Sequence, residues 1–213
     1  MAKRTLKKFE EFTGLENSLE FPQEVKGKWK KELFKNDNPL TLELACGKAE
    51  YSLALAEMFP DRNFIAIDKK GNRMWRGAKT AVEKKLSNVL FLRIYIEDLM
   101  SYFDENEVEE IWITFPDPFP RKGKAKKRLT SPRFLKMYDQ ILTAPGQVHL
   151  KTDDKQLFDY TIEAIEAEKW NVNDSQQDIY GSSKMDPLLK IQTYYEKLHL
   201  EDGRKIYYLR FGR

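Results

Sequence analysis

The chain has 213 residues and a mass of 25.2 kDa, and its formal net charge at pH 7 is +3. A single cysteine, Cys46, excludes an intramolecular disulfide and favours a reducing compartment. No apolar run approaches the roughly 18–20 residues that span a bilayer, and the amino terminus lacks an apolar signal core. We therefore expect a cytoplasmic protein without a membrane partner, folded as one domain over residues 1–213.

Strand-like apolar runs and helix-like periodic segments alternate through the middle of the chain. Residues 1–37 precede them as a polar, weakly periodic stretch, which we expect to form an amino-terminal arm. Strands are expected at residues 40–45, 63–67, 88–94, 110–115, 147–151 and 205–211. Helical spacing is expected at residues 51–59, 72–85, 97–103, 132–142, 157–170 and 193–200. This alternation predicts an α/β fold in which helices cover both faces of a parallel sheet.

Acidic residues mark the ends of four successive predicted strands. The first strand runs through Glu43 into a turn at Gly47, and the second ends at Asp68. The third is followed by Glu97 and Asp98, and the fourth by Asp117. Because open α/β sheets bind ligands at the carboxyl ends of their strands, we expect these acids to surround one site.

The same residues indicate which adenosine cofactor this site binds. A nicotinamide dinucleotide requires a G-x-G-x-x-G turn, whereas this turn offers Gly47 alone. Glu43 and Glu50 would repel a pyrophosphate but would suit the sulfonium and ammonium charges of S-adenosylmethionine. Asp68 is placed to accept hydrogen bonds from both hydroxyls of a ribose. A methyl donor is therefore favoured over a dinucleotide.

A proline-rich loop and a basic run follow the fourth predicted strand. In the segment FPDPFP, prolines at alternate positions hold Asp117 in a preset, extended backbone. The segment RKGKAKKRLTSPR comes next and carries seven Lys or Arg and no acid. Such a concentration of positive charge attracts a polyanion, so we expect chemistry on a nucleic acid.

From Leu40 to Arg213 the chain resembles the bacterial tRNA (guanine-N7)-methyltransferase family. The resemblance rests on ELACGKAE with AID, FPDPFPRKGKAKKRLTSPRFL, HLKTDDKQLFDY and IQTYYEKLHLEDGRKIYYLRF. It implies a Rossmann-like class I methyltransferase with a mostly parallel seven-stranded sheet. The implied reaction is methyl transfer from S-adenosylmethionine to N7 of a guanosine in the tRNA variable loop (tRNA position 46). Three departures are Ala45-Cys46-Gly47 for a G-x-G turn, Phe119 for a tryptophan, and Gly123-Lys124 for an Arg-His pair.

The resemblance also assigns roles to individual residues. It places Asp117 at the catalytic position and at the cofactor. The cofactor contacts that it implies are Glu43, Gly47, Asp68 and Glu97. The substrate contacts are Arg121, Asp153, Thr193, Tyr194, Tyr195 and Glu196. The segment from 123 to 128 corresponds to a tRNA-binding loop, and with Lys122 the RNA-binding set is Lys122, Gly123, Lys124, Lys126, Lys127 and Arg128.

The chemistry of guanine limits what Asp117 can do. N7 of neutral guanine has a free lone pair, so its methylation removes no proton from the nucleophile and requires no general base. We therefore expect Asp117 to accept hydrogen bonds from the guanine edge and to position the ring. Cys46 is interpreted as a packing residue. His149 and His199 have no metal-ligand spacing with each other or with Cys46, and we expect no metal site.

Two other functions compete with this one. Asp-Pro-Phe-Pro is similar to the Asp/Asn-Pro-Pro-Tyr/Phe motif of methyltransferases that act on an exocyclic amine, although the adjacent prolines are missing. A non-catalytic RNA-binding module of the same fold is the second alternative. The acids Glu43, Asp68 and Asp117 argue against such a module, because carboxylates near phosphate oppose RNA binding. The sequence leaves a homodimer open.

Overall fold

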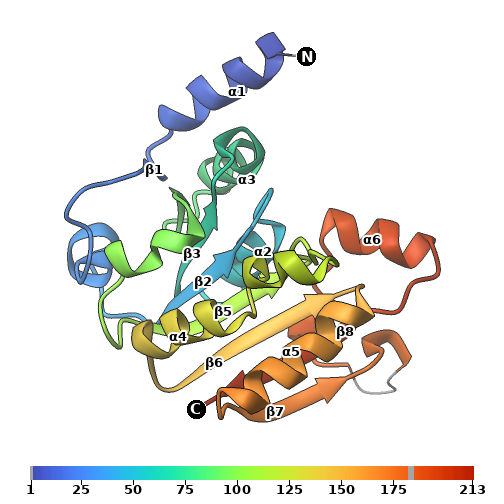
Figure 1. Cartoon of the computed structure of the whole chain (residues 1–213). Helices are drawn as coiled ribbons and strands as arrows, with labels where there is room; N and C mark the ends of the chain where they lie inside the picture. Colours follow the sequence, from blue (N-terminus) through green and yellow to red (C-terminus); the bar gives the residue numbers. More distant parts are fainter. Residues whose placement is uncertain (1, 182–184) are drawn as a thin grey trace.

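The computed structural model describes residues 2–181 and 185–213 (Figure 1). Its strands are β1 (Ser18–Glu20), β2 (Leu40–Leu44), β3 (Asn63–Asp68), β4 (Val89–Arg93), β5 (Val108–Thr114), β6 (Leu142–Thr152), β7 (Asn171–Gln176) and β8 (Tyr207–Gly212). Its α-helices are α1 (Ala2–Thr13), α2 (Glu50–Met58), α3 (Gly71–Glu83), α4 (Pro132–Ile141), α5 (Lys155–Ala167) and α6 (Tyr194–Glu201). Shorter helical segments are η1 (Trp29–Phe34), η2 (Ile96–Ser101), η3 (Lys122–Lys127), η4 (Ile179–Gly181) and η5 (Pro187–Lys190).

The described strands form one mixed sheet in the order β1-β4-β3-β2-β5-β6-β8-β7. All neighbouring strands are parallel except that β8 runs antiparallel to both β6 and β7. The expected α/β class and the mostly parallel sheet are therefore confirmed. The sheet has eight strands where seven were expected.

Two of the eight strands, β1 and β7, lie outside the six ranges in which strands were expected, and both come from segments with weak sequence signals. β1 lies inside the expected amino-terminal arm, and its three residues are too few to show an alternating pattern. It joins the sheet through backbone pairing with β4. β7 has the polar sequence NVNDSQ and forms an edge strand beside β8. Both strands are held by ladder hydrogen bonds, which any side chain allows, so neither required an apolar run.

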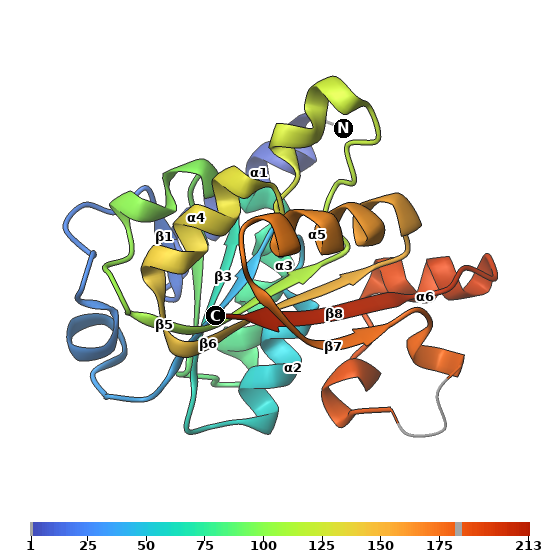
Figure 2. The ribbon, with the colours of Figure 1, turned by 60° about the horizontal axis from the view of Figure 1, so that its bottom comes forward.

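Each face of the sheet has its own hydrophobic core, because successive strand residues point to opposite faces. Ile65 and Ile67 of β3 pack with α4 and α5, whereas Phe64 and Ala66 pack with α2 and α3. Figure 2 shows α4 and α5 on one side of the sheet and α2 on the other. The expected covering of both faces by helices is thus observed.

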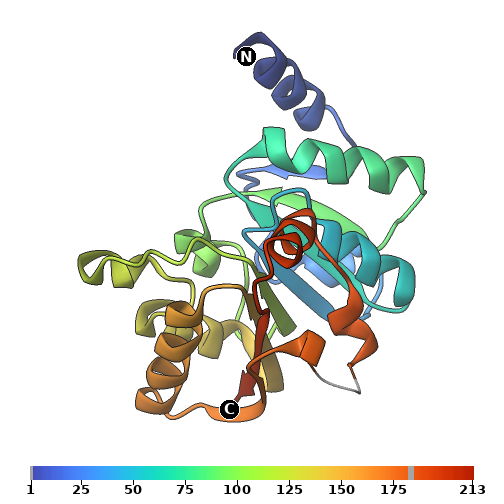
Figure 3. The same ribbon diagram turned by 90° about the vertical axis from the view of Figure 1, so that its right-hand side faces the viewer.

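The amino-terminal segment packs on the α3 side of the molecule. Phe12 of α1 is fully buried and lies so near the start of α3 that a Cβ on Gly71 would come within 2.9 Å of its ring. Figure 3 shows α1 next to α3, at the edge of the molecule. Trp29 of η1 is also fully buried, with its indole nitrogen donating to the carbonyl of Tyr102 at 2.7 Å. Through Trp29 and Phe12, this segment therefore contributes to both cores.

Candidate active site

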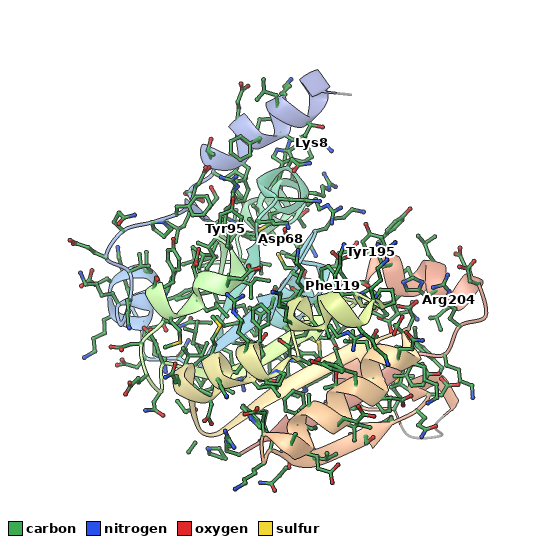
Figure 4. The ribbon with its side chains drawn as sticks, in the orientation of Figure 1. Lys8, Asp68, Tyr95, Phe119, Tyr195 and Arg204 are labelled. Atoms are coloured by element: carbon green, nitrogen blue, oxygen red, sulfur yellow. The ribbon has the colours of Figure 1, made fainter. Side chains whose placement is uncertain are left out.

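The carboxyl ends of the central parallel strands meet at a topological switch point. From β2 the chain builds outward through β3 and β4, then returns to place β5 on the other side of β2. Leu44 of β2 lies opposite Ile67 of β3 and Ile113 of β5, so these strands end nearly level. Figure 4 shows Asp68 on β3, Phe119 beyond β5 and Tyr195 on α6 around this edge. Ligands of open α/β folds bind at such a position.

The turn between β2 and α2 forms the floor of this edge. Ala45, Gly47 and Ala49 all have left-handed backbone conformations, with φ between 56° and 58°. The amide of Cys46 donates to the carbonyl of Ile67 at 3.0 Å, which ties the turn to β3. A Cβ on Gly47 would meet no atom within 4 Å, so the turn faces open space at that point. Backbone at such a position can approach a ligand closely.

Gly77 is a second glycine required at this turn. It lies in α3, and a Cβ at this position would come within 2.2 Å of the carbonyl oxygen of Lys48. Only glycine allows α3 to pass so close to the turn. The sequence pattern did not single it out, because one glycine within a helical segment carries no signal of a tertiary approach.

Asp68 is oriented by two backbone amides. The amide of Gly47 donates to Oδ2 at 3.1 Å, and the amide of Lys70 donates to Oδ1 at 2.9 Å. The residue is only 8% exposed. Hydrogen bonds from N–H groups to a carboxylate are charge-assisted, so they fix the position of this side chain strongly. Each oxygen retains capacity to accept one more donor.

Glu43 is a buried carboxyl on the α2 side of the sheet. Its Oε2 accepts hydrogen bonds from the amide of Ser52 at 2.8 Å and the hydroxyl of Ser52 at 2.5 Å. Its Oε1 accepts from the hydroxyl of Thr114 at 3.2 Å. Burial nevertheless raises the pKa of Glu43 to about 7, because desolvation of the charged form outweighs these donors. Its charge therefore changes close to physiological pH.

Cys46 lies in the turn after β2, near both of these acids. Burial raises the pKa of its thiol well above the usual value, and the negative charges of Glu43 and Asp68 raise it further. A cysteine is nucleophilic only in its thiolate form, so Cys46 is unreactive at neutral pH. The environment agrees with its interpretation as a packing residue.

Glu97 and Asp98 occupy the first turn of η2, just beyond β4. Both side chains are exposed, and neither is fixed by a side-chain hydrogen bond to another described residue. The structure thus brings the pair to the same end of the sheet as Asp68, but it does not separate their roles. Glu97 stays the predicted cofactor contact.

Asp117 lies in the loop that follows β5, and its side chain is exposed. The loop is bounded by two aromatic residues with left-handed backbones, Phe115 with φ 50° and Phe119 with φ 44°. Bulky residues rarely adopt such angles, and strained backbone of this kind concentrates at functional sites. The loop therefore presents one free carboxylate from a constrained backbone at the switch point.

The predicted RNA-binding residues follow this loop, in η3 and at its C-cap, and divide into two groups. Those from Lys122 to Lys127 are exposed, apart from the half-buried Ala125, and so is Arg121 before them. In Figure 3 the η3 segment projects away from the body of the molecule. Arg128 differs, because it is buried and its guanidinium donates to the backbone carbonyls of Pro118 and Phe119.

The four predicted substrate residues at the start of α6 also divide into two groups. Thr193 and Glu196 form a reciprocal capping box, and both are buried. Glu196 pairs with the fully buried Lys151 at 2.8 Å. Tyr194 and Tyr195, by contrast, are 47% and 50% exposed. In this structure the buried pair fixes the helix end, and the two tyrosines are the members available to a ligand.

Asp153 lies just beyond the end of β6. One of its oxygens accepts from Arg204 at 2.7 Å and lies 3.5 Å from Nδ1 of His199. These partners attach α6 and the segment after it to the sheet edge. Asp153 stays a predicted substrate contact, and it is half-buried.

Further features of the described residues concern cavities, metal-binding groups and membrane-spanning helices. A hollow of about 180 Å³ lies at the amino end of β6, beside Asp139, Gly146 and Trp170. Among residues 2–181 and 185–213, no group of three His, Cys, Asp or Glu side chains is arranged to hold a metal ion. None of the described helices has the length and apolarity needed to cross a membrane.

Solved structures show the same fold in other methyltransferases. The 16S rRNA methyltransferase KamB superposes with a TM-score of 0.67 at 15% identity, covering 89% of this chain and 94% of that one. The 16S rRNA (adenine(1408)-N(1))-methyltransferase from Catenulisporales acidiphilia, in a structure with the cosubstrate SAM, gives a TM-score of 0.57 at 11% identity. That match covers 85% of this chain and 88% of the other.

Sequence comparisons identify the family. Residues 37–209 match the family model described as "Putative methyltransferase". The tRNA (guanine-N(7)-)-methyltransferase of Bacteroides fragilis is 45% identical over 99% of this chain and 86% of its own length. The enzyme of the same name from Christiangramia forsetii is 44% identical over 99% of this chain and 98% of its own length. The chain belongs to the tRNA (guanine-N7)-methyltransferase family.

Proposed function

We propose that this protein transfers a methyl group from S-adenosylmethionine to N7 of a guanosine in tRNA, and that the target is position 46 in the variable loop. The observation that carries the reaction is the identity of 44–45% with tRNA (guanine-N(7)-)-methyltransferases over 99% of the chain. The arrangement of acids at the switch point supports it from the chemistry of the site. Since tRNA is the substrate, we place the protein in the cytoplasm.

The residues at the β2–α2 turn fit the cofactor. Backbone at Gly47 faces open space, and the carboxylate of Asp68 beside it has remaining acceptor capacity for ribose hydroxyls. The exposed Glu97 adds negative charge, and Glu43 adds it when it is ionised. This charge favours the sulfonium and ammonium of the ligand and opposes a pyrophosphate. When bound, S-adenosylmethionine supplies an electrophilic methyl group.

Asp117 positions the guanine. Its carboxylate accepts hydrogen bonds from the N–H groups on the Watson–Crick edge of the base, which fixes the ring plane. The lone pair on N7 then points at the methyl-donor side of the edge. No proton leaves the nucleophile, so Asp117 acts by orientation and electrostatics and not as a base. Its exposed position beyond β5 leaves the carboxylate free for this contact.

The exposed cations of η3 bind the tRNA backbone. Lys122, Lys124, Lys126 and Lys127 make no ion pair with any carboxylate among the described residues, so their charge is available to phosphates. Arg121 precedes them, close to Asp117 in the chain. The exposed rings of Tyr194 and Tyr195 provide stacking surfaces for nucleotides near the target, and Asp153 contacts the substrate from the end of β6.

Identification of the modified nucleoside tests this proposal. The protein is incubated with methyl-labelled S-adenosylmethionine and unmodified tRNA transcripts, and the RNA is digested to nucleosides. We expect label in 7-methylguanosine only. A matched transcript with adenosine at position 46 is expected to accept none. Label in an exocyclic amine of a base would show that the protein is an exocyclic-amine methyltransferase instead. Label in the control transcript would refute position 46 as the target.

A further inference from the structure

Arg128 is the buried exception in an exposed basic run. It is only 7% exposed, whereas its neighbours Lys126 and Lys127 are exposed. A buried guanidinium is costly unless its donors are satisfied. No carboxylate among the described residues lies within ion-pair distance of Arg128. Its partners are therefore neutral groups of the protein, and its burial is a built feature of the loop.

The contacts of Arg128 are directed at one short segment. Its Nε donates to the carbonyl of Pro118 at 3.0 Å, and its Nη2 donates to the carbonyl of Phe119 at 3.1 Å. The guanidinium also lies 4.2 Å from the ring centroid of Tyr160 on α5. One edge of the planar group thus holds two consecutive peptide units while its face contacts α5. Lysine offers neither the fork nor the flat face.

The segment that Arg128 holds requires support from outside. Prolines at 116, 118 and 120 have no amide hydrogen, so the loop makes few hydrogen bonds of its own. Phe119, whose carbonyl accepts from Arg128, is also one of the two residues of this loop with left-handed φ. Strained backbone persists only where its surroundings hold it. Among the described residues, Arg128 provides the side-chain hydrogen bonds that reach this loop.

The base of this arrangement is attached to the helices of the α4–α5 face. The hydroxyl of Tyr138 on α4 donates to the carbonyl of Leu129 at 2.9 Å. The hydroxyls of Thr130 and of Thr161 on α5 are hydrogen-bonded at 2.7 Å. Residues immediately after Arg128 are therefore anchored, and the guanidinium reaches back from a fixed point to the loop that carries Asp117.

We propose that Arg128 is a positioning residue: it holds the backbone of Pro118 and Phe119 so that the carboxylate of Asp117 meets the guanine, and it does not bind a tRNA phosphate. This assignment rests on the proposed role of Asp117 in the reaction. It removes Arg128 from the RNA-binding set and leaves the exposed cations of η3 in it. Within one basic run, the exposed cations of η3 therefore determine the affinity for tRNA, and Arg128 determines the turnover rate.

The substitution Arg128→Lys tests the separation because it keeps the charge and removes the fork. We expect kcat to fall on the order of 10- to 100-fold, the effect of a small displacement of a reacting group. The KM for tRNA and the salt dependence of tRNA binding should stay at wild-type values. Hydrogen exchange at the amides of Asp117 and Phe119, measured without ligands, should become faster.

Two matched comparisons separate this role from a structural or an RNA-binding one. Lys127→Gln should show the opposite pattern, with a higher KM, a salt slope flatter by about 0.7–0.9 and an unchanged kcat. On α5, Tyr160→Leu removes the ring and should lower kcat, as Arg128→Lys does. Tyr160→Phe keeps the ring and should have the wild-type kcat. Thermal unfolding and S-adenosylmethionine affinity of each variant show whether the fold is retained.

Either of two results would overturn the proposal. If Arg128→Lys had the wild-type kcat and wild-type hydrogen exchange at the loop amides, the loop would not need the hydrogen bonds from Arg128. A raised KM and flattened salt slope in Arg128→Gln, with kcat unchanged, would make Arg128 a phosphate contact. The hydrogen-exchange measurement requires no substrate, so it tests whether Arg128 holds the loop even if the wild-type protein does not methylate tRNA. That failure would refute the proposed function and not the role of Arg128 in the loop.

Discussion

The two sides of the candidate active site are built in opposite ways. On the β2–β3 side, Asp68 and Glu43 are buried, and their oxygens accept hydrogen bonds at fixed distances from protein donors. On the η3 side, Lys124, Lys126 and Lys127 are exposed and unpaired among the described residues. A small cofactor needs fixed polar partners, whereas a large polyanion needs a concentration of charge. The Asp117 loop lies between the two and combines a free carboxylate with a held backbone.

Asp117→Asn is expected to have the largest effect, because it changes the one group that belongs to both sides. The amide keeps one acceptor but loses the charge. The methylation rate should fall about 10²–10³-fold, as when one preorganised polar group is removed from an active site. S-adenosylmethionine affinity should change much less. The measurement is single-turnover methylation of a tRNA transcript, with cofactor binding by calorimetry as the control.

The pH profile of the same reaction sharpens the role of Asp117. A general base would make the rate rise through its pKa. Positioning predicts a nearly flat rate between about pH 6 and 8 at saturating cofactor, because N7 is already unprotonated. A wild-type rate in the Asn variant at any pH in this range would leave Asp117 without a part in the reaction.

Glu43 gives the cofactor side its own pH dependence. Its pKa is about 7 when folded, against a usual value of 4.5. A raised carboxyl pKa stabilises the fold fully below pH 4.5, and this contribution is lost as pH rises through 7. A shift of this size corresponds to about 3 kcal/mol. Relative to Glu43→Gln, the wild-type free energy of unfolding should therefore fall by up to this amount between about pH 4 and 8, mostly between the two pKa values.

Urea unfolding without cofactor measures this difference. Cofactor binding should show the opposite trend, since ionised Glu43 attracts the positive charge of the ligand. The affinity of the wild type for S-adenosylmethionine should increase as pH rises through 7, and that of the Gln variant should vary less. Parallel stability curves for the two proteins would contradict the raised pKa.

Asp68→Ala tests the fixed partners on the cofactor side. The carboxylate is expected to accept one or two charge-assisted hydrogen bonds from ribose hydroxyls, each contributing on the order of 1.5–3 kcal/mol. The dissociation constant for S-adenosylmethionine should increase at least about tenfold, while tRNA affinity stays unchanged. An unchanged dissociation constant for the cofactor would remove Asp68 from its binding site.

Charge reversal of Lys124, Lys126 and Lys127 to Glu tests the other side. Binding of tRNA should weaken on the order of tenfold, and its salt dependence should flatten by about 0.7–0.9 for each phosphate that the variant no longer neutralises. Cofactor affinity should be preserved. As a control, Lys136→Glu reverses a charge on α4, outside η3. A loss of tRNA affinity per reversed charge as large in this control as in the triple variant would make the effect one of net charge and not of the η3 surface.

The sequence predicted the central strands because they are buried on both faces and appear as continuous apolar runs. Phe64, Ile65, Ala66 and Ile67 of β3 are examples, all at most 2% exposed. It also placed Asp68 correctly at the carboxyl edge of the sheet, since parallel strands share their direction. β1 and β7 were missed because one has only three residues and the other is polar, so neither shows an apolar pattern in the sequence.

Burial of charged residues was the other part that the sequence did not reveal. Arg128 comes directly after a run of exposed cations, and its neighbours in the sequence do not distinguish it from them. Its difference arises from tertiary partners, Tyr160 and the carbonyls of the proline loop. Glu196 is hidden for the same reason, because its partner Lys151 lies 45 residues earlier in the chain. A charged side chain in a sequence is assumed to be solvated until the fold supplies a partner.

The most direct test of the central claim replaces the reacting atom. A tRNA transcript is prepared with 7-deazaguanosine at position 46, which has a C–H group in place of the N7 lone pair and keeps the Watson–Crick edge. We expect this transcript to bind with wild-type affinity, to compete with normal tRNA, and to accept no methyl group. Methyl transfer to the substituted transcript at the normal rate would contradict N7 of this guanosine as the target.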